Sequence, residues 1–61
     1  MNLKEQLRAV MEKARKIHAD AGENMTDDQY AEVKALVEQA DELRAKIAEN
    51  EERNATLAKL K

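Results

Sequence analysis

The chain has 61 residues, of which 39% are charged, with one aromatic residue, one histidine and no cysteine or proline. This length allows at most one small domain, whose stability is marginal without further support. The composition excludes disulfides and a structural zinc site of four Cys and His ligands. No run of about 18 apolar residues predicts a membrane span, and the charged N-terminus lacks the apolar region of a secretory signal. We therefore expect a cytoplasmic protein that self-associates or is attached to something larger.

The first predicted element is an amphipathic helix over residues 2–21. Apolar residues follow each other at steps of four and three, the spacing of a helix with one buried face. They are Leu3, Leu7, Val10, Ala14, Ile17 and Ala21, flanked by Met11 and His18. Gly22 comes next, in the position of a C-terminal helix stop.

A turn is predicted over residues 22–26 and a new helix after it. Thr26 and Gln29 have the S/T-x-x-E/Q spacing of a capping box, while Met25 and Tyr30 occupy the two positions of a hydrophobic staple. A single continuous helix would discard this cap and would lose about 1 kcal/mol at the glycine. Two helices are therefore the expectation.

The second predicted helix covers residues 27–60 and changes character near Ile47. Its stripe comprises Val33, Leu36, Ala40, Leu43, Ile47, Asn50, Asn54 and Leu57, with Tyr30 and Val37 beside the first half. Beyond Ile47 two asparagines occupy stripe positions. They are either surface residues of an exposed helix end or polar positions that set the register of an inter-chain coiled coil.

Folding the chain back at the turn predicts an all-α, antiparallel, coiled-coil-like hairpin as a single domain over residues 1–61. Counting outward from the turn places Leu3 near Leu43 and ends the first helix opposite Lys46, so residues 47–61 overhang. Residues 1–21 carry a net charge of +2 and residues 22–61 a net charge of −4, which favours the pairing. A two-helix core this small is expected to self-associate.

Two sets of residues are predicted to make contacts. The hairpin core and any remaining apolar face are expected to comprise Leu3, Leu7, Val10, Ile17, Tyr30, Val33, Val37, Leu43 and Ile47. The overhang is expected to make inter-subunit or linker contacts through Asn50, Asn54, Leu57 and Leu60.

No residue pattern predicts chemistry. His18 has carboxylates nearby, but a hairpin has no cleft to exclude water, so we interpret it as a boundary residue near the turn. Asp27 and Asp28 are explained by the helix dipole, and Glu51 and Glu52 by an exposed helix face. The basic run at residues 13–16 circles its helix and has no stacking aromatic beside it. We expect no enzyme activity, cofactor, metal or nucleic acid.

The layout resembles a known family. The Met-Asn-Leu-Lys start, the basic first helix, the turn with its glycine and the restart "MTDDQYAEVKALVEQADELRAKIAENEER" are similar to the N-terminal region of major capsid proteins of tailed bacteriophages. The motifs are the T-x-x-[EQ] restart and repeated L-x-x-[EQ]-A/I units. The resemblance covers residues 2–61, and in that family the region is called the delta domain.

The resemblance implies a scaffolding function. Delta domains line the interior of the procapsid in the host cytoplasm, associate with one another and with neighbouring capsid subunits, and promote correct assembly. A phage protease commonly removes them before maturation. The sequence ends at Lys61 without a capsid fold, so we expect an excised domain or a cleavage product, with processing near the final LAKLK.

Two other functional classes fit the same pattern. One is a free-standing coiled-coil adaptor that binds a specific partner protein. The other is a designed or excised hairpin with no activity of its own. The reading frame after codon 61 would distinguish them from a capsid domain.

Overall fold

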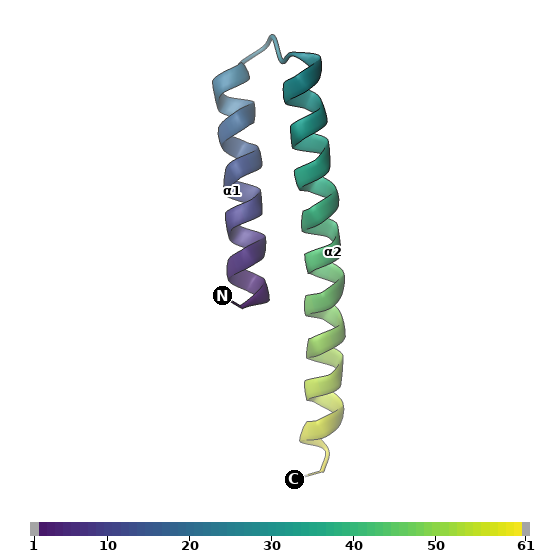
Figure 1. The fold of residues 1–61 in the computed structure, drawn as a ribbon. Helices are drawn as coiled ribbons and strands as arrows, with labels where there is room; N and C mark the ends of the chain where they lie inside the picture. The colour runs from purple at the N-terminus through teal and green to yellow at the C-terminus, as the bar shows by residue number, and fades with distance from the viewer. Residues whose placement is uncertain (1, 61) are drawn as a thin grey trace.

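The computed structural model describes residues 2–60, which form two α-helices packed side by side as an antiparallel hairpin (Figure 1). Helix α1 covers Leu3–Ala21 and α2 covers Asp27–Ala58. At 1.5 Å per residue their 19 and 32 residues span about 28 Å and about 48 Å. The prediction of an all-α hairpin with a longer second helix is confirmed.

Side-chain caps determine where α1 begins and ends. The Asn2 Oδ1 atom accepts a hydrogen bond from the Glu5 N–H at 2.8 Å, so Asn2 is the N-cap and the helix begins at Leu3, one residue later than predicted. At the other end the Gly22 N–H donates to the His18 carbonyl at 3.2 Å. Gly22 has φ +61° and ψ −134°, a backbone conformation that glycine adopts without strain.

The predicted capping box at the start of α2 is confirmed. The Thr26 hydroxyl accepts from the Gln29 N–H at 3.1 Å, and the Gln29 side chain accepts from the Thr26 N–H at 2.9 Å. At its other end α2 stops at Ala58, two residues earlier than predicted. There the N–H groups of Lys59 and Leu60 donate to the carbonyls three residues earlier, the tighter hydrogen-bond pattern of a 3₁₀ turn, so the α-helix ends.

The core between the helices is thin. The buried apolar residues are Ala14, Leu36, Ala40 and Leu43, and Ala40 is 0% exposed. Half-buried residues extend this core along both helices: Leu3, Leu7, Val10, Met11, Ile17, Val33 and Ile47. Alanines at two of the four buried positions allow the helix backbones to approach closely, because they add little volume between them.

Two residues of the set predicted for the core and any remaining apolar face lie outside the core. Tyr30 is 61% exposed and Val37 is 44% exposed, so they belong to the remaining apolar face of α2. Conversely, Ala14, Leu36 and Ala40 were on the predicted stripes but absent from the predicted contact set, which favoured larger side chains. The centre of the stripe is buried, whereas its flanks stay in contact with solvent.

The hairpin closes further along α2 than predicted. The Lys4 Nζ atom lies 3.5 Å from a Glu51 carboxylate oxygen, and the Arg44 guanidinium reaches the Met11 sulfur at 3.6 Å. Helical side chains lean toward the N-terminus of their own helix. In this hairpin a residue of α1 therefore contacts residues of α2 that are farther from the turn than a count of Cα positions indicates. Contacts with α1 therefore reach Glu51, about one helical turn beyond Lys46, where the pairing was predicted to end. The pairing of Leu3 with Leu43 stays a prediction.

Candidate functional site

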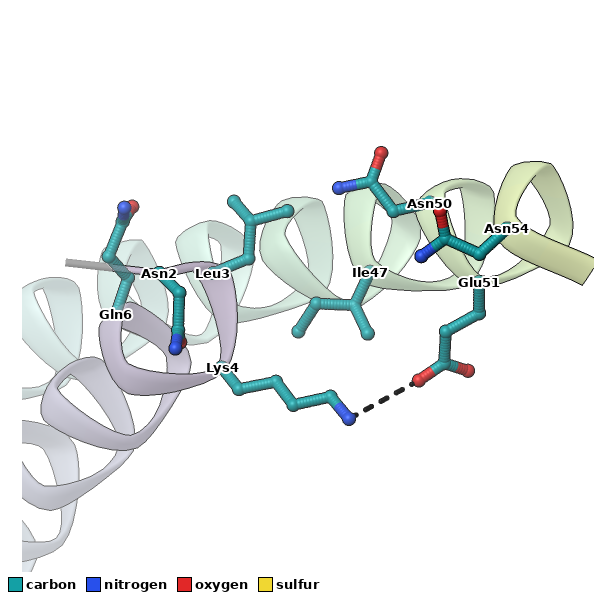
Figure 2. A pocket seen from close by; sticks show the side chains of 8 residues that line it. All are labelled: Asn2, Leu3, Lys4, Gln6, Ile47, Asn50, Glu51 and Asn54. Atoms are coloured by element: carbon teal, nitrogen blue, oxygen red, sulfur yellow. Dashed lines mark ion pairs between the residues drawn. The ribbon is translucent and has the colours of Figure 1, made fainter. Parts of the chain in front are cut away.

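A groove lies at the open end of the hairpin, where the first turn of α1 meets α2 (Figure 2). It has a volume of about 480 Å³. Its lining residues are Asn2, Leu3, Lys4, Gln6, Ile47, Asn50, Glu51 and Asn54. The structure thus brings two predicted overhang residues, Asn50 and Asn54, together with two predicted core residues, Leu3 and Ile47.

The groove combines a small apolar surface with amide side chains. Leu3 and Ile47 are half-buried and come from different helices. Asn50 and Asn54 follow on successive turns of α2, where each amide can both donate and accept hydrogen bonds (Figure 2). This lining suits the recognition of another helix with a matching polar and apolar pattern.

An exposed ion pair borders the groove. Lys4 and Glu51 are 3.5 Å apart, and their side chains are 73% and 64% exposed. Such a pair contributes about 0–1 kcal/mol, so it adds little to the stability of the hairpin. The sequence indicated that a basic first helix would pair with an acidic second one. It did not indicate that Lys4 and Glu51 would be the partners.

The overhang proper leaves its apolar side chains uncovered. Every residue from Ala48 to Leu60 is exposed, including Leu57 at 58% and Leu60 at 82%. On this segment the Arg53 guanidinium lies 2.8 Å from a Glu49 carboxylate oxygen, one helical turn earlier. Leu57 and Leu60 are thus placed where no residue of α1 reaches them, as predicted for the overhang.

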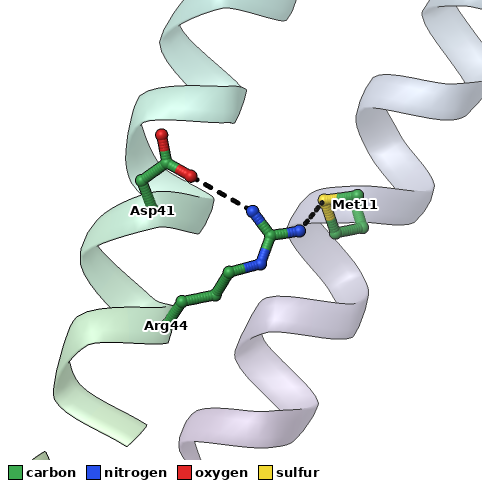
Figure 3. Close-up of polar contacts among 3 residues, drawn as sticks. All are labelled: Met11, Asp41 and Arg44. Carbon is green, nitrogen blue, oxygen red and sulfur yellow. Dashed lines mark hydrogen bonds and ion pairs between the residues drawn. The ribbon is translucent and has the colours of Figure 1, made fainter. Parts of the chain in front are cut away.

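A polar contact that the sequence analysis missed crosses between the helices at Arg44 (Figure 3). One guanidinium nitrogen lies 3.1 Å from an Asp41 oxygen and the other 3.6 Å from the Met11 sulfur. The i, i+3 spacing of Asp41 and Arg44 could have indicated the first contact. The second depends on the register of the helices, which residue spacing alone does not determine.

His18 is exposed in the last turn of α1 rather than at a boundary of the core. Among residues 2–60 no group of three or more His, Asp or Glu side chains is placed to hold a metal ion. Neither described helix combines the length and apolar content that a membrane span requires. The groove, the overhang and the exposed Tyr30 and Val37 are features of residues 2–60 that suit an interaction.

Comparison with protein-family models, curated proteins and solved structures found no match to this chain.

Proposed function

We propose that this chain is a scaffolding domain of the delta type, which promotes assembly of a tailed-phage major capsid protein through weak helical self-association. The proposal rests on the resemblance of residues 2–61 to such regions and on a hairpin that leaves apolar surface uncovered. In this role the chain lies inside the procapsid in the host cytoplasm, contacts neighbouring capsid subunits, and is removed by a maturation protease.

The observation that carries the proposal is the incomplete burial of the apolar stripe. Four residues are buried, whereas Tyr30, Val37, Leu57 and Leu60 are each more than 40% exposed. These side chains lie in two places, Tyr30 and Val37 on α2 near the turn, and Leu57 and Leu60 at and just beyond the C-terminal end of α2. Further helices packed against α2 would remove them from water, at about 25 cal/mol for each Å² of apolar surface.

Weak contacts suit a temporary scaffold. A domain attached to every subunit of a growing shell has a high effective concentration, so its pairwise affinity need not be strong. Weak pairing also allows misplaced subunits to separate and the domain to be released after cleavage. A small interface between exposed helix faces would have this property.

A deletion within the parent gene tests the scaffolding function. We expect the reading frame to continue past codon 61 into a capsid domain, and we expect removal of codons 2–61 to give few closed shells or aberrant ones. Electron microscopy and sedimentation of the assembled particles would measure this. Normal shells assembled by the deletion variant would overturn the proposal.

Sedimentation velocity of the 61-residue chain tests self-association directly. We expect the mean sedimentation coefficient to rise over a concentration series from about 10 μM to about 1 mM, the range in which weak interfaces assemble. A strict monomer at millimolar concentration would contradict a self-associating scaffold.

The second candidate is a coiled-coil adaptor for a specific partner protein. Tyr30 and Val37 favour it because they are seven residues apart, on one side of α2, and both are exposed. An amphipathic partner helix recognises such anchors. A monomeric chain whose gene stops after codon 61 would favour the adaptor over the scaffold.

A further inference from the structure

We infer that the overhang of α2, residues 47–60, pairs with the overhang of a second copy of this chain in antiparallel orientation. In this pair Ile47 of each copy packs against Leu57 of the other, and Asn50 of each lies against Asn54 of the other. The inference rests on the proposed function, because it assigns the surface through which the scaffold self-associates.

The stripe of the overhang has the same pattern in both directions. Ile47, Asn50, Asn54 and Leu57 follow at steps of three, four and three, so the order is apolar, polar, polar, apolar from either end. Antiparallel pairing therefore matches apolar with apolar residues and amide with amide. Asparagine pairs in a helical interface fix register and orientation at some cost in stability, which explains polar residues at these positions.

The charges of the overhang also favour the antiparallel orientation. Residues 47–52 carry three acids and no base, whereas residues 53–60 carry two bases and no acid. An antiparallel pair places the acidic half of one copy beside the basic half of the other, and a parallel pair places like charges together. The register also puts Arg53 of each copy level with Glu51 of the other.

The two-fold axis of this pair passes through residue 52. Glu52 of each copy is thus level with Glu52 of the other, but it lies two residues from both Asn50 and Asn54, on the side of α2 away from the stripe. Glu51 of each copy is level with Arg53 of the other, and Lys4 already lies 3.5 Å from Glu51 of its own copy. The exposed Lys4 ammonium would also lie near the C-terminal end of the second copy's α2, where a positive charge is favourable.

The shape of the hairpin leaves room for this partner. Helix α1 ends beside Ile47–Glu51, and α2 continues alone to Ala58 (Figure 1). The overhang of a second copy would lie along α2 on the side of the groove, next to the first turn of α1 at residues 47–51 and without α1 beside it beyond them. Its Leu57 would then cover the apolar part of the groove formed by Leu3 and Ile47. Each copy contributes about three helical turns, so the pair is small and weak.

Cysteine cross-linking tests the orientation, because the natural chain has no cysteine. We expect an oxidised equimolar mixture of Asn50→Cys and Asn54→Cys chains to give the mixed disulfide in clear excess over the statistical half. The matched control mixes Ala48→Cys with Thr56→Cys, which are at the same level of the register but on the outer face, and should show no excess. Predominance of the two homodimers would indicate parallel pairing and overturn the inference.

A charge scan separates this inference from the proposed function. We expect Leu57→Asp to weaken self-association at least about tenfold, because each copy loses a buried leucine, and Thr56→Asp to change it less than about fivefold. Circular dichroism of dilute samples would show that both variants remain helical. Equal self-association of both variants and the natural chain would overturn the overhang pairing alone, whereas a monomeric natural chain would overturn both proposals.

Discussion

Ala40 has no exposed surface, although it is one of the smallest side chains in the molecule. It is fully buried between α2 and α1, so its small size is part of the packing. A larger side chain there would force the helices apart or into unfavourable rotamers. We therefore expect the stability of this hairpin to depend on the side-chain volume at Ala40 and to change little with the side-chain volume at exposed alanines.

We expect Ala40→Leu to lower the free energy of unfolding by about 1–3 kcal/mol because the added volume has no space to occupy. Ala45→Leu, at an exposed position five residues later, is the matched control and should leave stability nearly unchanged. Urea unfolding followed by circular dichroism measures both. Equal stability of the two variants would show that the helices do not approach closely at Ala40.

Thr26 is the second residue at which a small change should have a large effect. Thr26→Ala removes the hydroxyl that accepts from the Gln29 N–H at 3.1 Å, and we expect a loss of about 1 kcal/mol. Thr56→Ala replaces the other threonine inside α2 and should be neutral or slightly stabilising, because alanine has the higher helix propensity. Thermal unfolding of both variants would distinguish the cap from a general effect of losing a threonine.

At the scale of the elements, the turn at Gly22 decides how the helices are joined. Its φ of +61° with ψ of −134° lies outside the left-handed helical region as well as the ordinary one. An added Cβ would meet nothing within 4 Å, so a substitution there would act through the backbone conformation and not through a clash.

Chemical synthesis of the 61-residue chain allows this cause to be isolated. Gly22→Ala with the natural L-residue should lower the free energy of unfolding by about 1–3 kcal/mol. The D-alanine version should retain the stability of the natural chain, because a D-residue favours the mirror-image backbone angles. A comparison of the two melting curves is the measurement, and equal loss in both would contradict a conformational origin.

The elements could be predicted from the sequence because local signals agree at each boundary. The Thr26 cap and the Gly22 stop are short-range features, so the helix ends were predicted to within two residues. The side-chain contacts between the helices were not predicted, since they depend on how side chains lean. The Lys4–Glu51 ion pair lies about one turn beyond the predicted end of the pairing. The groove at the open end was missed for the same reason, although Asn50 and Asn54 had been singled out as interaction residues.

At the scale of the whole molecule, the hairpin is an elongated rod. Its extents are 54 × 17 × 15 Å and its radius of gyration is 15.7 Å, compared with about 10.5 Å expected for a compact domain of this length. A rod of two helices exposes most of its surface to water. Its stability should therefore depend strongly on whether other helices cover it.

We expect the melting temperature of the natural chain to rise with protein concentration, because association stabilises the folded state by mass action. For a domain of this size each kcal/mol corresponds to about 4–8 °C, so a detectable rise should appear between about 10 μM and about 1 mM. Leu57→Asp is expected to flatten this dependence, and Thr56→Asp should retain it. A concentration-independent melting temperature would indicate that folding proceeds without association.

The unequal arms of the hairpin also determine how the molecule can serve as a spacer. Asn2 lies part way along the rod, beside Asn50 and Asn54, whereas Ala58 and the turn lie toward its opposite ends (Figure 1). A group joined beyond α2 would stand nearly the full 54 Å from the turn, and a group joined before α1 would project from the side. Groups attached at the two ends of this hairpin would therefore be held at two different distances from the turn.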